Sequence, residues 1–139
     1  MKVPRGTVEA MLAHARAGYP FEVCGVFLGR SGSRVEVAKP VVNRETELPR
    51  VRYQIAPQDL IRIQGEARAQ GLEILGYYHS HPDHPARPSE TDRRVAAGGL
   101  SDGVYHVVVG VEKGEKALPT AWVFRDATQS FEEEPFEVE

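Results

Sequence analysis

Two histidines separated by one residue, followed by a serine and an aspartate, form the segment of this chain best suited to chemistry. His79 and His81 flank Ser80, and the spacing H-S-H-x7-S-x-x-D continues to Ser89 and Asp92. Side chains at i and i+2 of a strand share a face, so both imidazoles can converge on one point. Three protein ligands leave one tetrahedral position open, as in catalytic zinc sites. The spacing therefore predicts a catalytic metal site made by His79, His81 and Asp92.

Ser89 and Asp92 also fit a purely structural pattern. S-x-x-D at the start of a helix is close to a capping box, in which the side chain at the third helical position bonds back to the cap. A carboxylate that reaches back to the cap is expected not to face the histidines. The two interpretations therefore make opposite predictions about Asp92, and the spacing leaves both open.

The identity of the metal depends on the reaction. Two histidines and one carboxylate also describe the facial triad of non-haem iron(II) oxygenases, whereas zinc is favoured if the chemistry is hydrolysis. Hydrolysis needs a general base that lies close to the bound water and is not itself a ligand. The candidates are Asp83, Glu90 and the more remote Glu22, which composition alone would make an exposed residue at a strand end.

A second motif overlaps the same segment. The residues H-S-H-P-D-H also match H-x-H-x-D-H, the signature of metallo-β-lactamase-like hydrolases. In that family the aspartate and the last histidine, here Asp83 and His84, bind a second metal, and further ligands follow on a larger αββα sandwich. Only one histidine, His106, follows here, and the chain is short for two such halves. This alternative makes Glu22 and Ser89 irrelevant.

Helical periodicity predicts three helices around this segment. The first has an apolar face at i, i+3, i+4 and i+7, made by Val8, Met11, Leu12 and Ala15. Pro57 suits the first position of the second helix, where its missing N–H does no harm, and Gly71 ends that helix. The expected helices span residues 4–18, 57–71 and 89–99.

Apolar runs and alternation predict the strands. Segments 23–29 and 72–79 are almost wholly apolar and are expected to be buried. In segment 34–42 we expect Val35 and Val37 to point inward, and a turn at 31–33 makes a hairpin with the first strand. Loops are expected at 43–52 and 81–88, and strands at 104–111 and 120–125. From residue 131 the acidic tail is expected to form an edge strand or a loose end. This mixture predicts an α/β or α+β domain with a single mixed β-sheet flanked by helices.

Length and composition limit the class of protein. A chain of 139 residues with 41% hydrophobic and 27% charged residues is expected to form a single soluble domain, residues 1–139. The net charge of −3 gives no general nucleic-acid footprint. The polar N-terminus predicts neither a signal peptide nor a membrane span. The single cysteine, Cys24, excludes an intrachain disulfide and fits the cytoplasm.

With Glu22 included, the sequence resembles the JAMM metalloprotease family, also called MPN-plus. Its motif is a glutamate in the first core strand, then H-[S/T]-H, seven residues and S-x-x-D, and every element is present here. The context P-x-E-x-C-G is also met, from Pro20 to Gly25. The resemblance covers essentially the whole chain and implies a cytidine-deaminase-like JAMM/MPN domain. Within it, Ser80 is expected to support the loop and Cys24 to pack in the core.

The resemblance also implies a role for each motif residue. His79, His81 and Asp92 would bind Zn²⁺, with water in the fourth position. Glu22 would accept the proton of that water and then protonate the leaving amine. Ser89 would donate a hydrogen bond to the oxyanion. These roles are those of a zinc metallopeptidase.

The substrate class implied by the resemblance is a protein tail. Family members cleave peptide or isopeptide bonds after the flexible tail of ubiquitin or a ubiquitin-like protein. The P-D-H-P-A-R-P-S loop is similar to that of the bacterial stand-alone group, which processes small sulfur-carrier proteins of ubiquitin-like fold. The alternative is a binding or scaffold module of the same fold that keeps zinc for stability. The sequence indicates no oligomeric state.

Overall fold

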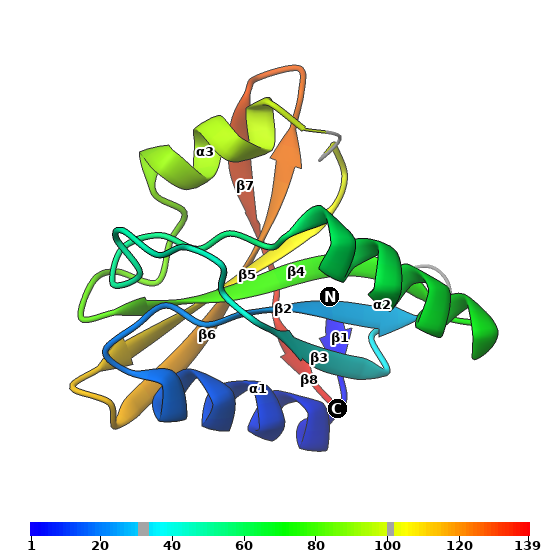
Figure 1. The fold of residues 1–139 in the computed structure, drawn as a ribbon, viewed down its shortest axis with the longest axis horizontal. Helices are drawn as coiled ribbons and strands as arrows, with labels where there is room; N and C mark the ends of the chain where they lie inside the picture. The colour runs from blue at the N-terminus through cyan, green and yellow to red at the C-terminus, as the bar shows by residue number, and fades with distance from the viewer. Residues whose placement is uncertain (31–33, 100–101) are drawn as a thin grey trace.

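A mixed six-stranded β-sheet forms the centre of the described structure (Figure 1). The computed structural model describes residues 1–30, 34–99 and 102–139. The strand order across the sheet is β3 (Val37–Val41), β2 (Cys24–Gly29), β4 (Glu73–Pro82), β5 (Tyr105–Glu112), β6 (Lys116–Arg125) and β7 (Ser130–Glu134). Only the central pair, β4 and β5, is parallel, and the other neighbours are antiparallel. The expected single mixed sheet is therefore confirmed.

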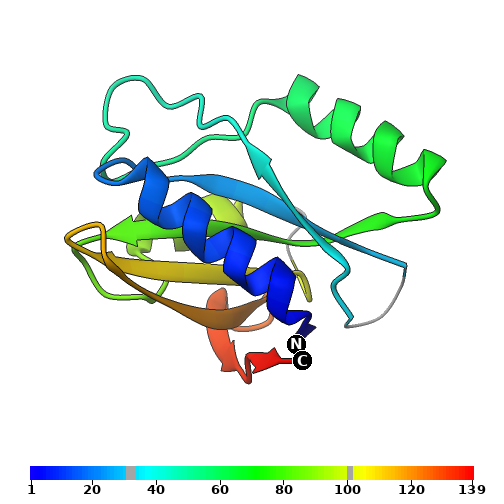
Figure 2. The same cartoon turned by 90° about the horizontal axis from the view of Figure 1, so that it is seen from below.

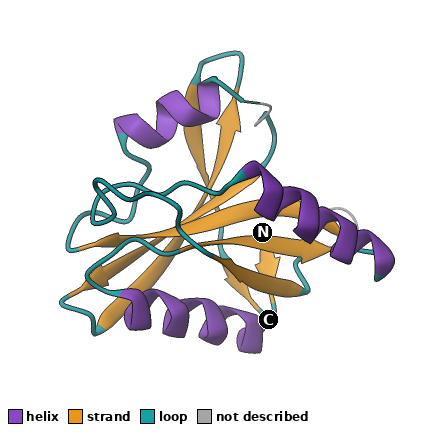
Figure 3. Ribbon diagram, in the orientation of Figure 1, coloured by secondary structure: helices purple, strands orange, loops and turns teal. Residues whose placement is uncertain are grey.

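Helices cover both faces of this sheet (Figures 1 and 3). Helix α1 (Arg5–Gly18) contacts β3, β5 and β6, and it crosses one face in the view from below (Figure 2). Helix α2 (Pro57–Ala69) contacts β4, and α3 (Glu90–Ala97) contacts β7, on the opposite face. The helix bounds agree with the sequence prediction to within two residues. The connection from β4 to β5 contains α3, so the end of β4 and the start of α3 lie close together.

Two apolar cores lie on the two faces of the sheet. The predicted face of α1 buries Val8, Met11 and Ala15 against Phe27 of β2 and Tyr78 of β4. The second core, on the α2 side, consists of Cys24, Val26, Leu28, Val41, Ile63, Ala67 and Leu72. Strands β2 and β4 are thus buried on both faces, which explains their apolar runs. Polar residues at the ends of these strands are the exceptions to that pattern.

Strand β4 is longer than the sequence predicted. We expected it to end at His79, but its pairing with β5 continues to Pro82. The strand can include Pro82 because β2 begins only at Cys24, opposite His79, so the end of β4 has no partner on that side. His81 therefore belongs to the strand and not to the following loop.

The prediction for the first hairpin was partly wrong. Val35 is fully buried, but Val37 is 41% exposed. The strand begins only at Val37 and lies at the edge of the sheet, so its alternation does not continue that of Val35. The predicted turn at 31–33 lies outside the described residues. Strand β6 also begins at Lys116, earlier than expected.

The two ends of the chain lie side by side. Strand β1 (Lys2–Val3) pairs in parallel with β8 (Glu137–Val138), and the N-terminal ammonium donates to the carbonyl of Pro135. The acidic tail begins as the edge strand β7, one of its two expected forms. Within the described part of the chain, every helix is too short or too polar to cross a membrane.

Candidate metal centre

Three side chains converge at the C-terminal end of β4. His79 and His81 share one face of this strand, and Asp92 lies in the first turn of α3. The Nε2 atoms of the two histidines are 3.1 Å apart. Oδ2 of Asp92 lies 3.1 Å from Nε2 of His79 and 3.2 Å from Nε2 of His81. The structure therefore brings the three predicted ligands together.

This triangle has the dimensions of one face of a tetrahedral site. Zinc with ligands at about 2.0–2.1 Å has ligand atoms about 3.3 Å apart. Nδ1 of His81 lies 2.8 Å from the carbonyl of Pro85, which can only accept, so this nitrogen carries the proton. In the neutral imidazole, Nε2 of His81 then presents a lone pair towards the carboxylate of Asp92. Lone pairs that face one another are repulsive unless a cation lies between them, so the donor set fits a metal ion.

Asp92 faces the histidines and caps α3 at the same time. Its N–H donates to Oγ of Ser89 at 3.1 Å, and its Oδ2 accepts from the N–H of Ser89 at 2.8 Å. The expectation that these two roles exclude each other is wrong. A carboxylate oxygen has two lone pairs and can serve two partners. The capping box therefore orients the carboxylate towards His79 and His81.

The pKa shifts of two candidate ligands, His79 and Asp92, suit metal binding. Burial lowers the pKa of His79 and favours its neutral imidazole. Burial alone would raise the pKa of Asp92, but its contacts with His79 and His81 outweigh burial and hold that pKa well below its usual range. Metal binding requires a neutral imidazole and an ionised carboxylate, and these are the states favoured here for His79 and Asp92.

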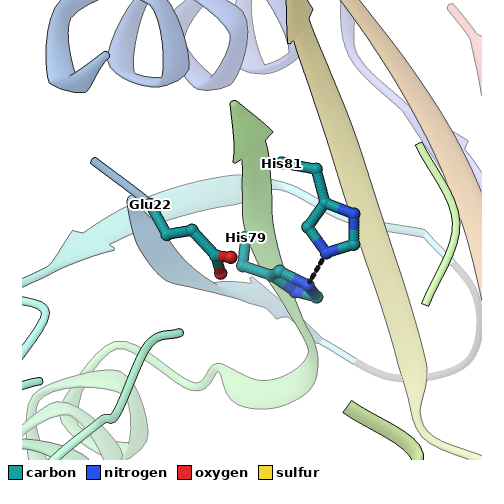
Figure 4. Close-up of side chains that lie close together, drawn as sticks. All are labelled: Glu22, His79 and His81. Atoms are coloured by element: carbon teal, nitrogen blue, oxygen red, sulfur yellow. Dashed lines mark hydrogen bonds between the residues drawn. The ribbon is translucent and has the colours of Figure 1, made fainter. Parts of the chain in front are cut away.

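Glu22 lies beside the two histidines, although it is distant from them in sequence (Figure 4). The motif implies that this glutamate lies in the first core strand. In the structure it precedes β2, which begins at Cys24. One carboxylate oxygen and ring nitrogens of His79 and His81 all lie within 4.8 Å of one another. Glu22 is only 3% exposed, and its Oε1 has no hydrogen-bond partner among the described residues. Burial, and secondarily the charge of Asp92, raises the pKa of Glu22 to about 8, as expected of a candidate general base.

Ser80 joins the glutamate segment to the histidine strand. Its N–H donates to the carbonyl of Val23 at 3.0 Å, and its Oγ accepts from the N–H of Val23 at 2.9 Å. The N–H of Val23 thus bonds to a side-chain hydroxyl and not to a main-chain carbonyl, just beyond the last paired residues of β2 and β4. Ser80 is fully buried and lies within β4, so it supports the strand and not the loop. Through Val23 it holds the neighbouring Glu22 beside the histidines.

Ser89 lies at the edge of a surface pocket. Its Oγ accepts from the N–H of Asp92, which leaves the hydroxyl proton available for another partner. A pocket of about 220 Å³ lies beside it, lined by Arg87, Pro88, Ser89, Glu90, Arg93, Trp122 and Phe131. The hydroxyl of this exposed serine is therefore accessible to a bound substrate.

Two of the three candidate bases are engaged elsewhere. Asp83 accepts hydrogen bonds from the hydroxyl of Tyr19 and from the N–H of Lys113, the latter at 2.7 Å. Glu90 forms an ion pair with Arg93 at 2.8 Å. Glu22 is the candidate base that lies beside the candidate ligands His79 and His81.

The metallo-β-lactamase-like alternative requires Asp83 and His84 to bind a second metal ion. The described residues do not form such a site. Asp83 accepts its hydrogen bonds from Tyr19 and Lys113 and not from the histidines. His84 packs its ring against that of His81, at 4.5 Å between centroids, and its Nε2 lies 3.9 Å from Oε2 of Glu22. His106 lies on β5 against Phe131. His84 is a loop residue, as expected, but it adjoins the candidate base.

Tyr53 is a site residue that the sequence analysis missed. Its ring stacks on the imidazole of His79, with 4.5 Å between centroids and 23° between planes. It lies in the loop between β3 and α2, which has no periodicity, so no pattern pointed to it. Cys24 packs as expected: it is buried, its thiol contacts the carbonyl of Val41, and burial raises its pKa to about 12.

Known proteins of one family match this chain over most of its length. The model of the prokaryotic homologs of the JAB domain matches residues 4–125. A desampylase of Haloferax volcanii is 42% identical over 94 residues, which cover 64% of this chain and 67% of that protein. A probable TtuB-protein conjugate cleaving protease of Thermus thermophilus is 36% identical over 94 residues, 68% of this chain and 62% of that protein. A CysO-cysteine peptidase of Mycobacterium tuberculosis is 38% identical over 90 residues, 64% of this chain and 60% of that protein.

Solved structures agree with this match. A protein from Desulfitobacterium hafniense, solved in solution, has a TM-score of 0.85 and 27% identity, and the match covers 100% of this chain and 93% of that one. A JAB1/MPN domain protein from Archaeoglobus fulgidus has a TM-score of 0.62 at 21% identity, over 99% and 98%, and shows the same fold. The chain spans about two thirds or less of the length of the curated relatives it matches. By its matched residues, fold and motif, this chain belongs to the family of prokaryotic homologs of the JAB domain, the JAMM family that its motif resembles.

Proposed function

We propose that this chain is a zinc-dependent metallopeptidase that cleaves the peptide or isopeptide bond after the C-terminal tail of a ubiquitin-like or sulfur-carrier protein. The observation that carries the proposal is the buried carboxylate of Glu22 beside the triangle of His79, His81 and Asp92. Burying an acid whose Oε1 has no hydrogen-bond partner in the described part of the chain costs folding free energy. A purely structural ion site has no use for such a group, whereas hydrolysis needs a base there.

Each side chain has a task in this reaction. Zinc held by His79, His81 and Asp92 would supply a Lewis acid and a water whose pKa is near neutral. Glu22 takes the proton of the attacking water on its carboxylate and passes it to the nitrogen of the leaving amine. The hydroxyl of Ser89 donates to the carbonyl oxygen as negative charge develops on it. The capping box keeps Asp92 oriented throughout.

We propose zinc instead of iron(II) because the carboxylate of Glu22 lies beside the candidate ligands. The facial triad of the iron oxygenases leaves several positions open for oxygen and a cosubstrate. Here a proton acceptor, Glu22, lies within 4.8 Å of the imidazole nitrogens, an arrangement that suits hydrolysis. Reconstitution with Zn²⁺ or Fe²⁺, followed by an assay for cleavage, tests this choice.

The proposed substrate class is inferred from the substrates that the relatives are named for. One is named for cleaving TtuB–protein conjugates and another for acting on CysO-cysteine. We extend that class to this chain as a small carrier protein whose tail ends at the scissile bond. The proposal treats residues 1–139 as one catalytic domain and places it in the cytoplasm, on the basis of its lone buried cysteine.

The experiment is an incubation of the purified protein with candidate carrier proteins from the same genome, each bearing a C-terminal extension. Intact mass is measured with Zn²⁺, with a chelator, and after Zn²⁺ is restored. We expect loss of the extension that stops with the chelator and resumes with zinc. Stoichiometric zinc without chelator-sensitive cleavage of any carrier would instead support the scaffold alternative.

A further inference from the structure

The carboxylate of Glu22 is positioned almost entirely through its main chain. Its Oε1 has no hydrogen-bond partner among the described residues, and its Oε2 lies 3.9 Å from Nε2 of His84, beyond hydrogen-bond distance. Both main-chain groups of Glu22, in contrast, are bonded. Its N–H donates to the carbonyl of Pro49 at 2.8 Å, and its carbonyl accepts from Nδ2 of Asn43 at 3.0 Å. Besides Ser80, which acts through Val23, groups outside the motif therefore hold the candidate base directly.

Asn43 uses all of its hydrogen-bonding capacity in these contacts. An asparagine amide has two donor hydrogens and one oxygen with two lone pairs. Nδ2 donates to the carbonyls of Glu22 and Arg52, at 3.0 and 3.1 Å. Oδ1 accepts from the N–H groups of Glu45 and Gln54, both at 3.0 Å. One half-buried side chain thus closes the loop between β3 and α2 and ties it to Glu22.

The same loop also reaches a metal-ligand candidate. Tyr53, which stacks on His79, lies between Arg52 and Gln54, and both of these neighbours are bonded to Asn43. Pro49, which accepts from the N–H of Glu22, lies in the same loop. Asn43 is therefore connected to both halves of the site, the glutamate and the histidines.

We propose that Asn43 is a positioning residue, which sets the place of Glu22 relative to the metal ligands by bonding its carbonyl and closing the loop beside it. The inference rests on the function proposed above for Glu22. Misplacement of a reacting group by about 1 Å lowers a rate by roughly a hundredfold. Asn43 is thus expected to control turnover more than substrate binding or zinc binding.

Two variants separate this role from general support of the loop. Asn43→Asp keeps an oxygen for the N–H groups of Glu45 and Gln54 but loses the amide that donates to the carbonyls of Glu22 and Arg52. Glu45→Ala is the matched control: its Oε1 accepts from the N–H groups of Glu47 and Leu48 and has no bond to Glu22. Should Asn43→Asp fail to fold, Asn43→Ser removes the donor amide without adding a charge.

The first readout needs no substrate. Hydrogen exchange at the amide of Glu22 is measured in metal-free and zinc-loaded protein, because that amide is held by Pro49 of the same loop. We expect exchange at least about tenfold faster in Asn43→Asp than in wild type, and little change in Glu45→Ala, since local opening controls such exchange. Unchanged exchange at Glu22 in Asn43→Asp would overturn the proposal.

The second readout is kinetic. We expect Asn43→Asp to lower kcat by about tenfold to a hundredfold with little change in KM and full zinc content, as positioning predicts. An equal loss of kcat in Glu45→Ala would show that only the loop matters and would overturn the role of Asn43. If wild-type protein cleaves no carrier, the proposed function fails, and the exchange measurement still decides whether Asn43 holds Glu22.

Discussion

The two halves of the candidate site are held by different kinds of structure. The ligand half, His79, His81 and Asp92, comes from one strand and the first turn of the following helix, and a capping box orients its carboxylate. The base half, Glu22, lies outside any strand and is held through its main chain by loop and side-chain contacts from elsewhere. Local regular structure thus presents the candidate ligands, whereas a few long-range hydrogen bonds position the candidate base. Changes in the first half should remove the metal, and changes in the second should slow the reaction while the metal stays.

The largest effect is expected from Asp92, which has two separable tasks. Asp92→Ala loses both the ligand and the acceptor for the N–H of Ser89, whereas Asp92→Asn keeps an acceptor. We expect both variants to lose stoichiometric zinc and all cleavage. Only Asp92→Ala should also lose the half of the capping box in which the carboxylate accepts from the N–H of Ser89, which lowers the stability of the metal-free protein by about 1 kcal/mol. Elemental analysis and denaturant unfolding measure the two effects, and full zinc in Asp92→Ala would refute the ligand role.

Ser89 should affect the rate without affecting the metal. Ser89→Ala removes the hydroxyl that we assign to the oxyanion, and kcat should fall by about 10²- to 10³-fold with zinc content unchanged. Ser89→Thr keeps both the hydroxyl and the cap and should retain most activity. Steady-state kinetics on zinc-loaded protein measure this difference. Equal activity of the alanine and threonine variants would remove Ser89 from the mechanism.

A smaller effect is expected from Ser80, which connects the two halves. Ser80→Ala leaves the N–H of Val23 without its acceptor, at a cost of about 1–3 kcal/mol in unfolding free energy. The loosened segment should also lower kcat by about tenfold, because Glu22 adjoins Val23. Ser80→Thr, which the motif permits, should restore both quantities. A fully active alanine variant would show that this hydrogen bond does not position the base.

The smallest effect is expected from Tyr53, whose ring packs on His79. Removing an aromatic contact of this kind costs about 0.5–1.5 kcal/mol. Tyr53→Ala should therefore weaken zinc binding by about twofold to tenfold, and Tyr53→Phe should leave it unchanged because the ring is kept. A competition titration with a zinc-binding dye compares the variants. A phenylalanine variant as weak as the alanine variant would show that the hydroxyl, and not the stacking, matters.

The convergence of His79, His81 and Asp92 could be predicted from the sequence because their geometry is local. The i, i+2 spacing of His79 and His81 and the helix start at Ser89 each follow from regular periodicity. The expectation that Asp92 either caps the helix or faces the histidines is wrong. The structure shows one carboxylate oxygen in both contacts. A carboxylate at the third helical position can therefore complete a capping box and still face two histidines.

The base half was less predictable for physical reasons. Glu22 approaches the histidines only because β2 and β4 pair with Cys24 opposite His79, and register between distant strands cannot be read from local periodicity. Only the motif context indicated it. Asn43 and Tyr53 were missed because their loop has no periodic pattern. Their contacts depend on the path of the chain in three dimensions.

The central claim is that Glu22 is the base of a zinc hydrolase and not a ligand or a structural acid. Glu22→Gln keeps the size of the side chain and removes its ability to accept a proton. Zinc content and cleavage of a carrier fusion should be measured on the same preparation of wild-type and variant protein. We predict full zinc in both, and a loss of kcat by about 10²- to 10⁴-fold in the variant. A Glu22→Gln protein that binds zinc and cleaves at the wild-type rate would contradict the account.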